Sequence, residues 1–171
     1  MRSRDPLSDP ERLIRRVYAY VAYRIGDGPD AEDVTAEAME RAVRYSDSYD
    51  PARGDATGWV IGIARRVLFS RAAARPTAAL DESAQTSDGF EEGSVRRVTL
   101  AAAVARLGER DRELVALRYG ADLSAREIAQ VLEMKTNAVE VALHRTVARL
   151  RAELASDPAV KPTAIVQPVP D

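Results

Sequence analysis

Apolar residues recur three and four positions apart in two long stretches of the chain, and this spacing limits the fold more than any other feature. Residues so spaced lie on one face of an α-helix, whereas a half-buried strand would alternate apolar and polar residues. Between Asp9 and Ala74 no such alternation occurs. The apolar stripe predicted for the first helix comprises Leu13, Ile14, Val17, Val21 and Ile25.

Turn-forming residues divide this first stretch into three predicted helices. The sequence GDGPD at 26–30 ends the first helix, and SYDPARGDATG at 48–58 separates the second from the third. We expect the second helix to start after residue 30 and to end near Tyr45. The third should run from Thr57 to Ala74. Its inward residues should be Trp59, Val60, Ile63, Val67 and Leu68.

A second helical stretch follows an acidic segment. Residues 76–94 contain five acidic residues and no basic one, and Pro76 prevents the preceding helix from continuing. Aromatic residues make up only 5% of the chain, which suits helix packing better than β-sandwiches or barrels. We predict an all-α fold with two small helical domains and a flexible acidic linker. The predicted segments are a domain at 9–75, the linker at 76–97, a second domain at 98–154 and a disordered tail at 155–171.

The stretch LSAREIAQVLEMKTNAVEVALHR, residues 123–145, has the pattern of a helix-turn-helix. Ser124 and Glu127 form a capping-box signature at the start of its first helix. Ala129, Met134 and Val139 provide the small and apolar residues that such a turn buries. A plain helical hairpin can produce similar spacing. At the turn, Glu133 stands where glycine is common, and a left-handed backbone there would cost about 1 kcal/mol more for glutamate.

The second helix of this motif is poor in basic residues on the face that would enter a DNA groove. Four residues share that face: Asn137, Glu140, Val141 and His144. Asparagine can bind adenine, glutamate can accept from cytosine, and valine can contact a thymine methyl group. We expect weak DNA binding from these residues alone. Phosphate contacts are expected from Arg112, Arg118, Arg126, Lys135, Arg145 and Arg149, each of which could equally be an exposed charge without a DNA role.

Composition excludes several other functions. The formal net charge is −2, so any DNA contact must come from local basic patches. The chain has no cysteine and one histidine, and no catalytic set, metal-ligand spacing or phosphate-binding loop is evident, so we expect neither an enzyme nor a cofactor or metal. No segment has the apolar length of a signal peptide or a membrane span, and we expect a cytoplasmic location.

Three stretches in this order resemble the extracytoplasmic-function branch of bacterial RNA polymerase sigma factors. They are DAEDVTAEAMERAVR at 30–44, YDPARGDATGWVIGIARRVL at 49–68 and the helix-turn-helix at 123–145. The resemblance implies a sigma domain 2, a connector and a sigma domain 4. It implies core RNA polymerase, through its β′ clamp helices and β flap, and promoter DNA as partners. An anti-sigma factor remains a further candidate partner.

The resemblance also assigns roles to residues. Those implied to contact polymerase are Asp33, Glu37 and Arg41. Those implied to capture the single-stranded −10 element are Tyr49, Arg53, Trp59, Arg65 and Arg66, although Trp59 is also a candidate core residue. Those expected to bind the −35 duplex are Arg126, Lys135, Asn137, Glu140, Val141, His144 and Arg145.

Two alternatives remain beside a sigma factor. A helix-turn-helix regulator with a response-regulator receiver domain would need alternating strands and helices in the first stretch. A sigma-like protein could bind polymerase or an anti-sigma factor but read DNA weakly, as the acidic recognition helix suggests.

Overall fold

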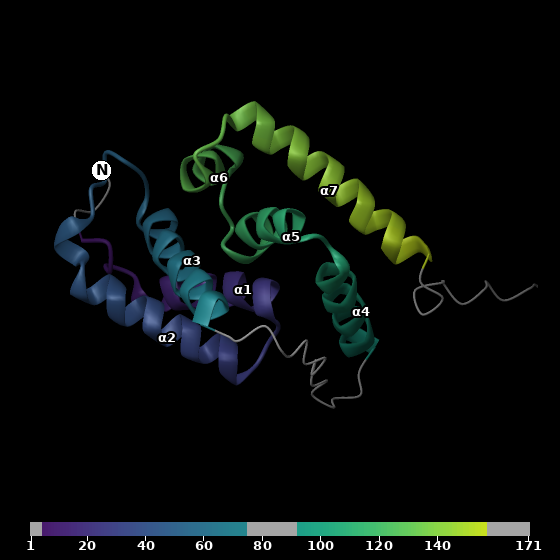
Figure 1. Cartoon of the computed structure of the whole chain (residues 1–171), viewed down its shortest axis with the longest axis horizontal. Helices are drawn as coiled ribbons and strands as arrows, with labels where there is room; N and C mark the ends of the chain where they lie inside the picture. The colour runs from purple at the N-terminus through teal and green to yellow at the C-terminus, as the bar shows by residue number, and fades with distance from the viewer. Residues whose placement is uncertain (1–4, 75–91, 157–171) are drawn as a thin grey trace, which may run out of the picture.

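The computed structural model describes residues 5–74 and 92–156, and its principal elements in these ranges are helices (Figure 1). A first block contains α1 (Pro10–Ile25), α2 (Pro29–Arg44), the short turn η1 (Ser46–Ser48) and α3 (Ala56–Ala74). A second block contains α4 (Glu92–Arg106), α5 (Glu109–Val115), the π-helical turn η2 (Ala116–Gly120), α6 (Ala125–Leu132) and α7 (Thr136–Ser156). The all-α prediction is confirmed.

The predicted linker and tail fall mostly outside the described residues. Within them, α4 already begins at Glu92 and α7 continues to Ser156. The last residues of the predicted linker therefore belong to α4, and the first residues of the predicted tail belong to α7.

Local sequence accounts for the ends of α1 and α2. The Asp9 side chain accepts a hydrogen bond from the backbone N–H of Arg12 at 3.1 Å, and Pro10 occupies the first turn, where its missing N–H is not needed. After α1, Gly26 and Gly28 have φ angles of 92° and 126°, which other residues rarely adopt. These two glycines let the chain reverse into α2, which begins at Pro29.

The buried face of α1 differs from the predicted stripe at two positions. Ile14 and Ile25 are 45% and 46% exposed, whereas Tyr20 is fully buried. Ile14 lies one residue beyond Leu13 and is therefore rotated by about 100° away from the buried face. Ile25 is the last residue of the helix. In α3, Val60, Ile63 and Val67 are buried as predicted, and Trp59 and Leu68 pack at the edge of the core.

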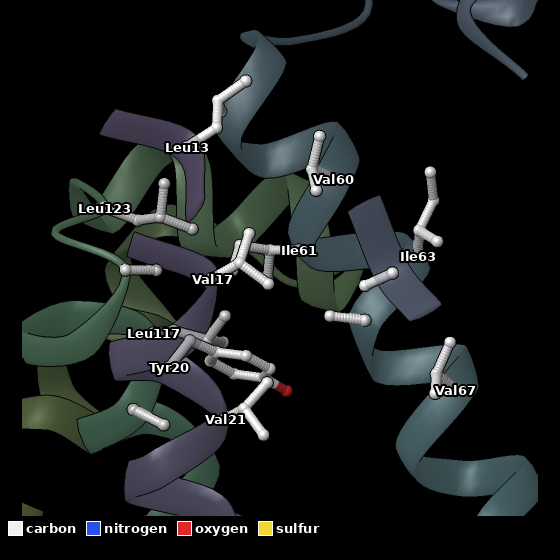
Figure 2. Close-up of a cluster of buried hydrophobic side chains, with 14 of the residues drawn as sticks. Leu13, Val17, Tyr20, Val21, Val60, Ile61, Ile63, Val67, Leu117 and Leu123 are labelled. Atoms are coloured by element: carbon white, nitrogen blue, oxygen red, sulfur yellow. The ribbon is translucent and has the colours of Figure 1, made fainter. Parts of the chain in front are cut away.

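The two blocks share one hydrophobic core. Leu117 of η2 and Leu123 from the second block belong to the same buried cluster as Leu13, Val17 and Tyr20 of α1 (Figure 2). Helix α1 packs on η2, and α3 packs on α6. The two predicted domains are thus packed together into one body, while α4 and the far part of α7 form a smaller second cluster.

Candidate nucleic-acid interface

The helix-turn-helix has the local geometry that its sequence predicts. Ser124 and Glu127 form the reciprocal capping box of α6. Helix α6 ends at Leu132 and is capped by Glu133, whose φ and ψ of 54° and 42° are left-handed. The N–H of Met134 then donates to Ala129 O at 2.9 Å. The left-handed conformation, whose cost for glutamate was considered from the sequence, is therefore present at Glu133. It allows α7 to start only a few residues later, at Thr136.

The predicted groove-facing residues form one exposed stripe on α7. All four of them are exposed, Val141 by 43%. We name this set, Asn137, Glu140, Val141 and His144, the recognition face. On the opposite side, Val139 and Thr146 are buried, and the Thr146 hydroxyl donates to Asp111 at 2.9 Å. This inward side keeps α7 anchored to α5 and leaves the recognition face accessible.

The six cations expected to contact phosphate divide into two groups. Arg126 on α6, Lys135 in the turn and Arg145 on α7 are exposed. In contrast, Arg112 donates to Leu107 O at 3.0 Å, Arg118 donates to Leu123 O at 2.9 Å, and Arg149 lies 2.6 Å from Asp111 in an ion pair. Arg112 and Arg118 thus satisfy backbone carbonyl groups that lack helical partners, whereas Arg149 joins α7 to α5 through the Asp111 carboxylate.

The loop before α3 is held together by its own side chains. Tyr49 donates its hydroxyl proton to Gly54 O at 3.2 Å, and its ring centroid lies 5.5 Å from that of Trp59. Trp59 also packs against the main core, so its contact with Tyr49 joins the loop to that core. Asp55 accepts from the N–H of Gly58 at 2.8 Å and so caps α3. Arg53 is exposed on the loop surface.

Arg65 and Arg66 are adjacent in sequence but have different environments. Arg66 is exposed. Arg65 donates through Nε to Glu113 Oε1 at 2.8 Å and through Nη1 to Val131 O at 3.0 Å, and both acceptors belong to the second block. The structure therefore does not present these two arginines as one cationic surface.

The residues implied to contact polymerase lie on one side of α2. Asp33 is exposed, while Glu37 and Arg41 are partly buried and paired with one another at 2.6 Å. Arg71 of α3 also binds Glu37, at 2.8 Å. This hydrogen bond from Arg71 is the main reason that the pKa of Glu37 lies below its ordinary value. Glu37 therefore connects α2 to α3 in addition to presenting a charge.

Glu113, which was not predicted from the sequence, makes several polar contacts between the blocks. Its side chain is only 12% exposed. Tyr20 donates to it at 3.0 Å, and Arg24 and Arg65 pair with it, each at 2.8 Å. We name Tyr20, Arg24, Arg65 and Glu113 the Glu113 cluster. Tyr20, a polar-tipped residue within the apolar face of α1, was the available sign of a buried hydrogen bond. Its partner, Glu113, lies too far along the chain to be identified from the sequence.

Two further features, a metal-ligand cluster and a membrane-spanning helix, are both absent from the described residues. No cluster of three potential metal ligands occurs among them. None of the helices in 5–74 and 92–156 combines the length and apolar character needed to cross a bilayer.

Comparison with known families identifies both blocks. Residues 11–75 match the profile of sigma-70 region 2, and residues 97–150 match that of sigma-70 region 4. The first block consists of helices, which contradicts the alternative of a receiver domain with alternating strands. The chain is a sigma factor of the sigma-70 class, a class of proteins that are not in general enzymes.

Three relatives place it within that class. The ECF RNA polymerase sigma factor BldN of Streptomyces coelicolor is 29% identical over 150 residues, covering 82% of this chain but only 57% of BldN. ShbA of Streptomyces griseus, also an ECF sigma factor, is 34% identical over 134 residues, covering 71% of this chain and 68% of ShbA. The RNA polymerase sigma-E factor of Streptomyces coelicolor is 32% identical over 134 residues, covering 76% of this chain and 75% of that factor. The chain belongs to the extracytoplasmic-function (ECF) family of RNA polymerase sigma factors.

Solved structures show the same fold at lower identity. The sigma factor RpoE of Bartonella quintana, solved in complex with the anti-sigma factor NepR, superposes with a TM-score of 0.62 at 16% identity, covering 85% of this chain and 93% of RpoE. CnrH, solved with the cytosolic domain of CnrY, superposes with a TM-score of 0.62 at 22% identity, covering 86% of this chain and 83% of CnrH.

Proposed function

We propose that this chain binds core RNA polymerase and directs it to promoters by recognising a −10 and a −35 element and nucleating DNA melting. The observation that carries the proposal is the presence of region 2 and region 4 in one chain, in that order, with an exposed recognition face on α7. The proposed location is the cytoplasm, where polymerase acts.

Polymerase docking is assigned to α2. Asp33, Glu37 and Arg41 follow one another at helical spacing and combine acidic and basic groups. Such a mixed polar surface suits the rim of a protein–protein interface. The β′ clamp helices are the proposed partner of this face, and the β flap is the proposed partner of the second block.

Capture of the −10 strand is assigned to the loop before α3 and to the first part of that helix. Single-strand binding combines cationic side chains for the backbone with aromatic rings for the bases. Arg53 and Arg66 are exposed cations, and Tyr49 is a partly buried ring beside Trp59. Arg65 would join them if its contacts with the second block were broken.

Reading of the −35 duplex is assigned to the recognition face. Exposed Arg126, Lys135 and Arg145 supply phosphate contacts that position α7 without specifying sequence. Because the recognition face itself carries no arginine or lysine, its own affinity should be low. Tethering to polymerase raises the effective concentration of α7 near the promoter and offsets this weakness.

An anti-sigma factor is a further proposed partner. The structural relative RpoE was solved bound to the anti-sigma factor NepR. The shared fold makes a comparable inhibitor reasonable for this chain, and affinity capture with the tagged chain would identify it.

Run-off transcription with purified core polymerase tests the proposed function. Addition of the chain should produce transcripts with defined starts from a promoter library. Tight binding to core polymerase without any defined start would instead support the sigma-like protein that reads DNA weakly. Absence of both binding and transcripts would contradict polymerase docking as well.

A further inference from the structure

Glu140 of α7 is an exposed carboxylate that forms no ion pair in the part of the chain that the structure describes. Exposed glutamates on the first two helices differ in this respect. Glu11 and Glu40 each pair with the arginine four positions later, at 3.8 and 2.6 Å. At the same spacing Glu140 has Thr136 before it and His144 after it, so α7 offers it no lysine or arginine. An unneutralised carboxylate therefore stands on the recognition face.

The packing of α7 holds Glu140 on the side of the helix that faces away from the protein. Figure 1 shows α4, α5 and α6 on one side of α7, and all three contact it. Val139 is fully buried on that side, and the Thr146 hydroxyl donates to Asp111 at 2.9 Å. Glu140 lies in the first two turns of α7, which begins at Thr136. In a helix-turn-helix, the N-terminal residues of the second helix contact base edges.

The hydrogen-bonding chemistry of a carboxylate limits the bases that Glu140 can bind. An ionised carboxylate accepts hydrogen bonds and donates none. In the major groove, the N4 amino group of cytosine and the N6 amino group of adenine are the base donors, whereas guanine and thymine present acceptors. Adenine also places its N7 acceptor beside the N6 donor, where it would repel the second carboxylate oxygen. Cytosine is therefore the base whose edge best complements Glu140.

Contacts with the DNA backbone give Glu140 no comparable gain. Phosphate groups repel a carboxylate, so its presence lowers the affinity for DNA of any sequence. When the groove excludes water from the carboxylate, a missing donor adds the cost of an unsatisfied charged group. The recognition face also has no arginine or lysine, the residues that commonly bind guanine. The charge of Glu140 is thus compensated only where the DNA presents a donor.

We propose that Glu140 is a specificity-determining residue, which selects cytosine at one position of the −35 element by accepting a hydrogen bond from its N4 amino group. The inference rests on the proposed function, because it deepens the assignment of the recognition face to the −35 duplex. At that position, cytosine should be favoured over guanine and thymine by about tenfold, a usual size for a side-chain contact with a base edge.

Transcription from a promoter library randomised across the −35 element tests this proposal with the full chain and core polymerase. Glu140→Gln keeps the shape of the side chain but adds a donor, and an amide can bind N6 and N7 of adenine together. This variant should therefore change the preferred base from cytosine to adenine at one position and leave the other positions unchanged. Glu140→Ala should abolish the preference at the same position without creating another.

Glu153→Gln is the matched control, since it removes one negative charge from α7 outside the recognition face. It should keep the cytosine preference of the wild-type chain. An unchanged preference in Glu140→Gln, with native helix content by circular dichroism, would overturn the proposal. So would a uniform gain at all promoters in both Glu140 variants, because Glu140 would then act by phosphate repulsion alone. Defined starts in which no base depends on Glu140 refute only this inference, whereas the absence of defined starts with the wild-type chain refutes the proposed function as well.

Discussion

At the residue scale, the turn of the helix-turn-helix depends on a strained glutamate. Glu133 has a φ of 54°, a conformation in which its β-carbon approaches the backbone too closely. The sequence made this strain predictable, because the turn is short and the residue is not glycine. Its presence shows that the turn geometry is retained at a cost in stability.

Glu133→Gly should therefore raise the free energy of unfolding, by about 1 kcal/mol. Urea denaturation followed by circular dichroism measures this change. Ala148→Gly, at an exposed helical position of α7, is the control and should lower stability by about 1 kcal/mol. A lower free energy of unfolding in Glu133→Gly would contradict this prediction. It would mean that the glutamate side chain stabilises the fold by more than its backbone strain destabilises it.

Tyr20 makes the stability of the folded chain depend on alkaline pH. Burial, and then the nearby Glu113 carboxylate, raise the pKa of Tyr20 far above its ordinary value. The folded chain therefore favours the neutral phenol. The stability that the neutral Tyr20 phenol contributes is complete below about pH 10, where the unfolded chain also keeps this proton. It is lost progressively as pH rises above that value.

Comparison of the wild-type chain with Tyr20→Phe isolates this contribution. At neutral pH the variant should be less stable by about 1.5–3 kcal/mol, because it lacks a hydrogen bond to a charged group. Between pH 9 and 11, approximately the range around the ordinary tyrosine pKa, its unfolding free energy should fall less steeply than that of the wild type. Parallel pH profiles would contradict a raised pKa of Tyr20 in the folded chain.

At the element scale, periodicity and capping signals predict the helices but not the way the two blocks meet. The capping box of α6 and the inward residues of α3 depend on neighbours within a few positions, and both were predictable. The contact between Tyr20 and Glu113 joins residues 93 positions apart. Neither helical spacing nor charge pattern identifies such a partner. The same reason explains why the contact between Arg65 and Glu113 was not predicted.

Among the elements, α2 carries the proposed polymerase contact. Combining Asp33→Arg with Arg41→Glu preserves the net charge but reverses the pattern, and should weaken binding to core polymerase about tenfold, equivalent to about 1.4 kcal/mol. Binding can be measured by fluorescence anisotropy of the labelled chain. The matched control exchanges the charges of Glu11 and Arg15, an exposed pair on α1. Unchanged affinity in the α2 variant, or an equal loss in the control, would contradict docking through α2.

At the scale of the whole molecule, two sequence units share one core. The packing of α1 on η2 and of α3 on α6 buries apolar side chains from both blocks (Figure 2). A sigma factor that reads two promoter elements must place its two reading surfaces apart on DNA. Under the proposed function, the contacts between the blocks must loosen when both elements are read, and contacts with polymerase and DNA must supply the energy.

The most direct test of the central claim is to sequence the promoters that become active when core polymerase is supplied with this chain. We expect defined start sites preceded by two shared elements at fixed separation. We further expect that Glu140→Ala alters the preferred −35 element and leaves the −10 element unchanged, because the recognition face is assigned only to the −35 duplex. Start sites without any shared upstream elements, or none above core polymerase alone, would contradict the assignment of this chain as a promoter-reading sigma factor.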